Sequence, residues 1–413
     1  MSEDRIIIVG AGIVGLACAD FLAAESHNVC VIDPDHEGDK ASYGNAAGIA
    51  VTECIPASSP GVFWKVPGWL LDPLGPLALR WSHAPALMPW FLRFSQVCRS
   101  EEMNRISAAL ADLNGRTYDD LLPMLERNGL SSELKRLGAL TVYETDEAFK
   151  KDKWEWDLKR RHGIECQELS GPQARELEPA LSKIVQRAVF TPQWSQVSEP
   201  RKLHNRMMKN LRDKGVQMLK GKAIAVQIQE ASATVMLQGG GSVSGAMAVV
   251  AAGAWSKPLA ASIGDRVLLE SERGYNTTLP HPGIDVTREI IFAERKFVAT
   301  PIDSGLRIGG AAEFGGLTSA PNMKRADALL DLARAYLPGL VEEAGVQWSG
   351  HRPATPDSLP VIGHSPRSRR LIYAFGHGHL GLTQSATTGR LVADIIANRD
   401  TSIDLAPFSI QRF

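Results

Sequence analysis

The sequence predicts an α/β protein that contains a Rossmann-like nucleotide-binding unit, and three observations carry this prediction. A glycine-rich turn at residues 10–15 directly follows an apolar run at the N-terminus. A helix-like stretch follows the turn, and a second apolar run ends in Asp33. Segments of the same type return at about 165–265 and at 348–413. Such alternation is typical of a parallel sheet with helices packed on its faces.

The N-terminal unit has the order strand, glycine turn, helix, strand and acid. The first glycine of the turn allows a tight bend, the second lets backbone approach a pyrophosphate, and the third lets the helix pack closely on the strand. The N–H groups and the dipole of the helix would then face the phosphates. Asp33 would accept a hydrogen bond from a ribose hydroxyl. This order predicts a dinucleotide site, with a purely structural glycine turn as the alternative, and it does not say which dinucleotide binds. The predicted contacts are Gly10, Ala11, Gly12, Ile13, Val14, Gly15, Asp33 and Pro34.

Length and composition are those of an ordinary globular protein. The 413 residues suffice for two domains with their own cores, and 44% of them are hydrophobic and 22% charged. The formal net charge of -1 argues against a nucleic-acid partner and against a membrane contact held by charge. The five cysteines show no CxxC pair and no metal-ligand spacing, so we expect reduced thiols in a cytoplasmic protein and no metal site. No signal peptide is expected before the first strand.

Residues 56–94 differ from the rest, with seven prolines and four tryptophans. Scattered prolines prevent one long regular element. The segment is either packed over a pocket or forms a surface that touches lipid or a partner. The prolines favour the packed arrangement, because they would interrupt an amphipathic membrane helix.

The remaining elements follow from periodicity. Residues 231–256 form the longest uncharged stretch, but three consecutive glycines make strand, turn and strand the prediction rather than a membrane span. The apolar run that enters Gly253 predicts backbone lying close to a ligand. Helices are predicted over 101–128, 146–162, 202–214, 322–336 and 385–397, and strands over 138–143, 289–292, 297–301 and 306–310.

Six landmarks occur in order along nearly the whole chain: the turn 10–15 with Asp33, then 41–48, 176–181, 251–256, 348–353 and 376–381. In this order they resemble the D-amino acid oxidase superfamily of FAD-dependent oxidoreductases. Residues 89–94 and 305–310 make the chain most similar to bacterial D-amino acid dehydrogenases, including those that act on D-proline and D-hydroxyproline.

The resemblance implies FAD as the cofactor. Its binding is expected to be non-covalent, because no cysteine lies in an attachment motif. The resemblance also implies a discontinuous FAD-binding domain of residues 1–55, 165–265 and 348–413, interleaved with a mixed-sheet, α+β substrate-binding domain of 56–164 and 266–347. Backbone N–H groups near Gly381 would stabilise negative charge on the reduced flavin. The further cofactor contacts implied are Ser42, Asn45, Ala46, Ala47, Gly48, Ile49, Ala252, Gly253, Trp255, Gly350, His377, Gly378, His379, Leu380, Gly381, Leu382 and Thr383.

Arg352 is the candidate cation for a substrate carboxylate. It follows a glycine turn, precedes Pro353 and matches the family pattern Trp-x-Gly-x-Arg-Pro. A guanidinium suits this task because it binds a carboxylate through two parallel hydrogen bonds. The alternative is an arginine that pairs with an internal Asp or Glu, or that holds the domain junction.

Three more side chains are candidates for the catalytic site. His379 stands where glycine-oxidising relatives carry a second arginine; it would order the substrate amine or a water, or bond to backbone. Tyr275 and Tyr43 would each donate a hydroxyl to the carboxylate, with satisfied core tyrosines as the alternative. Val298 replaces a tyrosine of those relatives, so the carboxylate is bound differently here or the pocket is less polar.

The reaction implied is oxidation of a D-amino or cyclic imino acid to the imine by hydride transfer from the α-carbon to flavin N5. Such a step depends on positioning and needs no side-chain base. A D-proline or D-hydroxyproline type of substrate and a linear D-amino acid both fit. The alternatives are a glycine- or sarcosine-type oxidase using oxygen, a flavoprotein subunit of a larger dehydrogenase complex, and a nicotinamide-dependent dehydrogenase. The acceptor, oxygen or a quinone, and the oligomeric state stay open, and the expected location is the cytoplasm, either free or peripheral to the inner membrane.

Overall fold

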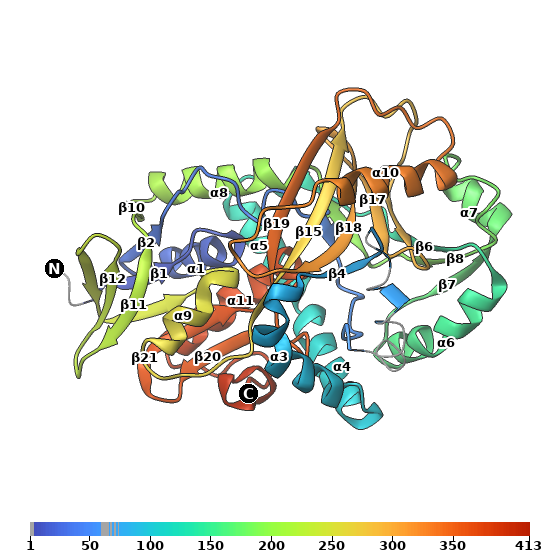
Figure 1. The fold of residues 1–413 in the computed structure, drawn as a ribbon. Coiled ribbons are helices and arrows are strands. Elements are labelled where there is room, and N and C mark those ends of the chain that lie inside the picture. Colours follow the sequence, from blue (N-terminus) through green and yellow to red (C-terminus); the bar gives the residue numbers. More distant parts are fainter. Residues whose placement is uncertain (1–3, 59–65, 67, 70–71, 73) are drawn as a thin grey trace.

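Two large sheets that lie side by side organise the computed structural model of the chain (Figure 1). The structure describes residues 4–58, 66, 68–69, 72 and 74–413. One sheet has six strands and the other nine, and two three-stranded sheets accompany them among the described residues. The six-stranded sheet lies on the left in Figure 1, with the N-terminus, and the nine-stranded sheet lies on the right.

The six-stranded sheet joins strands from three distant parts of the chain. Its first five strands are parallel, and the last pair is antiparallel. The central strand β1 is apolar throughout and buried on both faces, as expected where helices or a further sheet cover a parallel sheet. The order is β10 (Gln217–Lys220), β2 (Val29–Asp33), β1 (Ile6–Val9), β14 (Met247–Val250), β21 (Ser368–Phe375) and β20 (Val361–Ser365).

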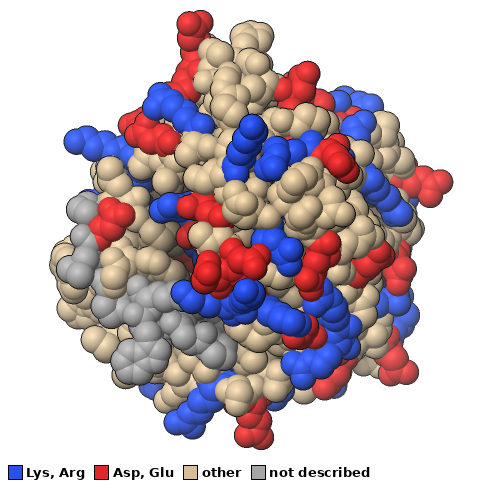
Figure 2. Space-filling view, turned by 90° about the vertical axis from the view of Figure 1, so that its right-hand side faces the viewer, with Lys and Arg blue, Asp and Glu red and all other residues tan. Residues whose placement is uncertain are grey.

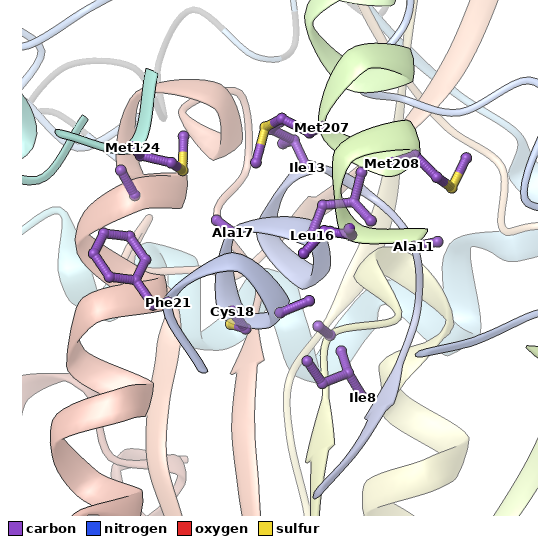
Figure 3. Packing of buried hydrophobic residues seen from close by; sticks show 14 of the residues in the cluster. Ile8, Ala11, Ile13, Leu16, Ala17, Cys18, Phe21, Met124, Met207 and Met208 are labelled. Atoms are coloured by element: carbon purple, nitrogen blue, oxygen red, sulfur yellow. The ribbon is translucent and has the colours of Figure 1, made fainter. Parts of the chain in front are cut away.

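Helices cover one face of this sheet. α1 (Ile13–Ala24) packs against α11 (Gly381–Ile396), α8 (Pro200–Asp213) and α5 (Thr117–Arg127). Figure 3 shows side chains of α1 together with Met207 and Met208 of α8 and with Met124 of α5. The opposite face is covered by α9 (Ser256–Ala261) and a small sheet. The strands of that sheet are β11 (Ala223–Ile228), β12 (Ala233–Leu237) and β13 (Ser242–Gly245).

The nine-stranded sheet is mixed and carries its own core. Its outer face packs on α10 (Lys324–Tyr336), while α6 (Asp146–Arg161) and α7 (Gly171–Leu177) lie beside β6 and β8. The order is β19 (Val346–Ala354), β15 (Glu270–Leu279), β18 (Gly305–Phe314), β17 (Phe297–Ile302), β16 (Glu289–Phe292), β6 (Ala139–Tyr143), β8 (Arg187–Thr191) and β7 (Gln167–Ser170), with β4 (Leu77–Leu79) paired to β18. A third sheet joins β3 (Gly48–Ile49), β9 (Ser195–Val197) and β5 (Leu134–Lys135).

Two predicted elements differ from the structure. The helix predicted over 101–128 is two helices, α4 (Ser100–Gly115) and α5, which separate at Gly115, a poor helix former. The segment 56–94 contains α3 (Ala84–Val97), a helix that tolerates Pro89 in its second turn. Trp90 of α3 is buried and donates to Ala354 O at 3.0 Å, so this part is packed, whereas Trp81 is 73% exposed. Residues 59–65, 67, 70–71 and 73 of the segment lie outside the described residues.

The sheets do not divide the chain where the predicted domain boundaries do. β7 and β8, within the predicted cofactor segment 165–265, pair in the nine-stranded sheet. α4 and α5, within the predicted substrate segment 56–164, pack on α11 beside the six-stranded sheet. The reason is that apolar spacing reveals that a face is buried but not which sheet buries it.

The visible surface carries charges of both signs, in keeping with the formal net charge of -1. Positive and negative side chains are interspersed on the face in Figure 2. None of the described helices combines the length and apolar character that crossing a bilayer would require.

The five cysteines are free, and burial raises the pKa of each thiol, that of Cys18 to about 12.

Candidate active site

One cavity of about 1190 Å³ runs from the N-terminus of α1 to the nine-stranded sheet. One end is lined by the glycine turn and Asp33, and the middle by the loop 42–50 and the turn 376–382. The other end is lined by β6, β16, β15 and β19. The volume exceeds that of ordinary small-ligand pockets, so it suits an extended dinucleotide together with a second, smaller ligand.

At the first end, glycines keep the backbone close-packed. Gly10 has φ of +111°, which favours glycine, and a Cβ there would overlap Ala251 O. A Cβ at Gly15 would overlap Gly10 O, so helix and strand touch at this point. Gly12 instead faces open space, with Ser42 Oγ 3.6 Å from where its Cβ would be. Within these described residues, Ser42 Oγ accepts from Ile13 N, the first N–H of α1, at 2.9 Å. The first turn of α1 holds no acid, so the following N–H groups and the helix dipole favour an anion.

Asp33 lies at the same end but is already engaged. Its Oδ1 accepts from Asp35 N and from Lys40 Nζ, each at 2.9 Å, and its Oδ2 accepts from Ala11 N at 2.8 Å. A carboxylate has about four acceptor positions. Oδ2 therefore retains room for one further donor, such as a ribose hydroxyl.

The loop 42–50 is held by side chains of the nine-stranded sheet. Asn276 Nδ2 donates to Gly44 O at 2.7 Å, and Arg307 Nη1 donates to Tyr43 O at 3.2 Å and to Asn45 O at 2.7 Å. Three consecutive carbonyls are thus fixed by two residues of the other sheet. Thr383 Oγ1 also accepts from Ala50 N at 2.9 Å, which ties this loop to the start of α11.

The turn 376–382 presents a second helix N-terminus to the cavity. Gly381 and Leu382 begin α11 and line the cavity, and within this described helix neither a side-chain cap nor an acid occupies the first turn. His377 is fully buried and its Nε2 lies 2.9 Å from Thr388 Oγ1. Burial lowers the pKa of His377 to about 3, so it is a neutral, structural histidine whose place is fixed by that hydroxyl.

Arg352 lies in the cavity and also pairs with an internal acid. Its Nη1 donates to Glu272 Oε1 at 2.8 Å and to Ala311 O at 3.0 Å. The two side chains are cross-strand neighbours on β19 and β15 and retain 29% and 24% exposure, which they present to the cavity. Arg352 therefore forms an internal ion pair, as in the alternative interpretation, while part of its side chain remains exposed in the cavity.

His379 lines the same end of the cavity. Desolvation is the largest influence on it and lowers the pKa of its imidazole, and the charges of Arg352 and Lys159 act in the same direction. The carboxylates of Glu272 and Glu53 oppose this lowering. The imidazole is therefore neutral near pH 7, and this position contributes no fixed positive charge.

The hydroxyls of both candidate tyrosines have hydrogen-bond partners within the protein, and their bonds to a substrate carboxylate stay a prediction. Tyr275 lines the cavity, but its hydroxyl donates to Glu313 and accepts from Asn322 N at 3.1 Å. Tyr43 donates to Asn205 Oδ1 at 3.0 Å and packs against His204, outside the cavity lining. Both behave as satisfied core tyrosines.

Comparison with known proteins identifies the family. A family model described as FAD dependent oxidoreductase matches residues 5–395. The chain belongs to this family. Similar curated proteins are a D-amino-acid oxidase of Bradyrhizobium diazoefficiens, 36% identical over 100% of both chains, and a D-amino acid dehydrogenase of Paramagnetospirillum magneticum, 31% identical over 99% of both. They confirm the resemblance to D-amino acid oxidases and dehydrogenases, and with it an oxidoreductase that uses FAD.

Solved structures share the fold. Glycine oxidase from Geobacillus kaustophilus superimposes with a TM-score of 0.74 at 24% identity, over 99% of both chains. L-proline dehydrogenase from P. horikoshii does so with a TM-score of 0.76 at 18% identity, over 100% of this chain and 98% of that one. The predicted fold, that of the FAD-dependent oxidoreductase family, is therefore confirmed.

The cavity of this FAD-dependent oxidoreductase fits its cofactor. The start of α1, whose first turn holds no acid, suits a diphosphate, Asp33 retains room for a ribose hydroxyl, and the start of α11 suits the negative charge of a reduced flavin. Most of the predicted cofactor contacts line the cavity, including Ile13, Val14, Pro34, Ala46, Gly48, Ala252, Gly253, Trp255, Gly350, Gly378 and Leu380. Five do not and pack behind it: Ala11, Gly15, Ala47, Ile49 and Thr383.

Several cavity residues were not found by sequence reasoning. Glu272 lies three residues before the candidate Tyr275, but nothing in the sequence indicates that it lies beside Arg352. Arg307 lies within the 305–310 motif used for the resemblance. Glu289 and Ile291 both face the cavity, because alternate side chains of β16 point to the same side. The spacing within one strand does not reveal which of its two sides faces a cavity.

Glu289 is a buried acid with no opposite charge beside it in the described part of the chain. Its Oε2 accepts from Trp194 Nε1 at 2.9 Å and lies against Gly48. Burial raises the pKa of Glu289 to about 8, and the Glu53 carboxylate adds to this. The side chain is therefore protonated at neutral pH.

A stability difference should follow from this pKa. Between its ordinary value of 4.5 and about 8, the folded state keeps a proton that the unfolded state has lost, so stability falls as pH rises through this interval. We expect Glu289→Gln to lose this pH-dependent part of the free energy of unfolding, which is on the order of several kcal/mol. Urea unfolding of both proteins at pH 5 and pH 8.5 measures it; an equal pH dependence in the two proteins would contradict a protonated Glu289.

Proposed function

We propose that this chain oxidises a D-amino acid or a cyclic imino acid with FAD, and that Arg352 binds the substrate carboxylate. The observation that carries the proposal is the Arg352 guanidinium exposed in the same cavity as the predicted flavin contacts Gly48 and His379. The names of the relatives support D-amino acids as the substrate class. The predicted division into an FAD-binding and a substrate-binding domain belongs to this proposal.

The residues of the site have distinct roles in this reaction. When bound, FAD accepts a hydride from the substrate α-carbon. Arg352 holds the carboxylate, and the neutral His379 adds no second positive charge beside it. Val298 and Ile291 give the adjoining wall an apolar surface, which suits an aliphatic or ring side chain. Positioning of this kind is sufficient for hydride transfer.

Anaerobic flavin bleaching tests the proposal. We expect the purified yellow protein to be reduced by at least one member of a panel of D-amino acids, D-proline and D-hydroxyproline, and at most slowly by their L-enantiomers. Glycine and sarcosine in the same panel test the glycine-oxidase alternative. A flavin that stays oxidised with the whole panel would instead favour the flavoprotein-subunit alternative.

Two further measurements define the cofactor and the acceptor. We propose that FAD is bound non-covalently, so acid or heat denaturation should release all flavin into the supernatant. Reoxidation of the reduced enzyme by oxygen or by a soluble quinone separates oxidase from dehydrogenase. Flotation with inner-membrane-like vesicles separates a cytoplasmic enzyme from one peripheral to the membrane.

A further inference from the structure

The cavity contains an acid in direct contact with the proposed carboxylate site. Glu272 and Arg352 are opposite each other in the register of β15 and β19. Their ion pair joins Arg352 Nη1 and Glu272 Oε1 at 2.8 Å. A buried arginine that only held two strands together would be shielded from the cavity, but both side chains line it.

The contacts leave one edge of each group available. Arg352 Nη1 donates to Glu272 Oε1 and to Ala311 O. Nη2 packs against Gly274, so closely that a Cβ on this glycine would overlap it. Within the described residues, Oε1 is the oxygen of Glu272 that is hydrogen-bonded and Oε2 is not. A guanidinium edge and a carboxylate oxygen therefore lie next to each other and face the same cavity.

No other charged group in contact changes this arrangement among the described residues. Phe314, which opposes Glu272 on β18, is uncharged. His379 is exposed where it lines the cavity, and desolvation lowers the pKa of its imidazole, so it adds no fixed positive charge. Glu53 is occupied by Lys159 Nζ at 2.6 Å. Glu272 is thus the carboxylate that a ligand on Arg352 meets first.

This pair matches the two charges of an amino acid. The carboxylate of the ligand fits the free guanidinium edge, and its ammonium group fits Glu272 Oε2. A carboxylate without an amine would meet Arg352 but would also be repelled by the neighbouring Glu272. The same acid therefore attracts one ligand class and disfavours the other.

We propose that Glu272 is a specificity-determining residue that receives the amino group of the substrate while Arg352 receives its carboxylate. The site would then select amine-bearing acids over plain and hydroxy acids. This inference rests on the proposed function, because it assumes that Arg352 is the carboxylate site.

A matched pair of unreactive ligands tests it in the FAD-loaded enzyme. 2-Aminoisobutyrate has a carboxylate and an amine but no α-hydrogen to transfer, and isobutyrate is the same molecule without the amine. Dissociation constants come from the shift of the flavin absorption spectrum on titration. We expect the wild-type protein to bind 2-aminoisobutyrate more tightly than isobutyrate.

The variant Glu272→Gln should reverse the preference. Loss of the charged acceptor should weaken 2-aminoisobutyrate at least about tenfold, whereas isobutyrate should bind as well or better. Glu272→Asp keeps the charge and should retain more of the preference than Gln. Glu270→Gln is the control on the same strand, because Glu270 pairs with Lys257 and His83 outside the cavity, and it should leave the preference unchanged.

The outcomes separate this inference from the proposed function. Equal weakening of both ligands by Glu272→Gln would mean that Glu272 only orients Arg352, and unchanged constants would mean that it has no role; either result overturns the inference while substrate panels still reduce the flavin. If neither ligand shifts the wild-type spectrum and no amino acid reduces the flavin, the proposed function fails together with the inference.

Discussion

Arg352→Ala is expected to lower kcat/KM for the best D-amino acid by roughly 10²–10³-fold, because a desolvated carboxylate loses its charged partner at a cost of about 3–4 kcal/mol. The variant also leaves the Glu272 carboxylate without its cation, which repels the substrate further. Anaerobic stopped-flow reduction measures the effect as a higher apparent dissociation constant and a slower limiting rate.

Arg352→Lys refines this expectation. A lysine keeps the charge but presents a point charge in place of the planar fork, so it should recover only part of the loss. The flavin content of both variants must equal that of the wild type, since Arg352 is assigned to the substrate and not to FAD. Efficiency within a few-fold of wild type in either variant would show that the carboxylate binds elsewhere.

Gly15→Ala is expected to destabilise the protein by roughly 3 kcal/mol and to abolish FAD retention. The added Cβ overlaps the backbone oxygen of Gly10, so α1 must move away from β1, and backbone cannot yield as a flexible side chain does. Because α1 packs on α8, α5 and α11, the displacement would loosen the core in Figure 3. Chemical unfolding of the flavin-free protein measures the cost.

Gly12→Ala is the matched comparison in the same turn. Its Cβ would meet only Ser42 Oγ at 3.6 Å, so the flavin-free protein should keep its stability. The methyl group would nevertheless occupy space beside the helix N-terminus where the diphosphate is expected, and FAD affinity should fall at least about tenfold. Equal stability losses in the two variants would remove the distinction between a packing glycine and a cofactor-facing glycine.

The regular elements were largely predictable from local pattern. β16 has the predicted residues 289–292, and α6 and α8 lie within one or two residues of the predicted ranges. Each is marked by apolar spacing that its own residues carry. The break between α4 and α5 had a local signal in Gly115, whereas the tolerated Pro89 did not, because its helix is held by the packing of Trp90 on Phe314.

The candidate site was predictable only in part. Arg352 and His379 were found because a motif surrounds each of them, and both line the cavity. The hydroxyls of Tyr43 and Tyr275 were assigned to substrate, yet they bond to Asn205 and Glu313. A residue type states which hydrogen bonds a side chain can make, whereas its direction depends on strand face and bulge.

By itself, the sequence determined the FAD-dependent oxidoreductase family, the glycine turn and the choice of Arg352 as the candidate substrate arginine, since these depend on residue types at short spacings within one segment. Only the tertiary structure decided which sheet each strand joins and that Glu272 lies beside Arg352. Those two residues are 80 positions apart, and their contact comes from the register of β15 against β19. Register is set by the packing of the whole sheet, so a local pattern does not contain it.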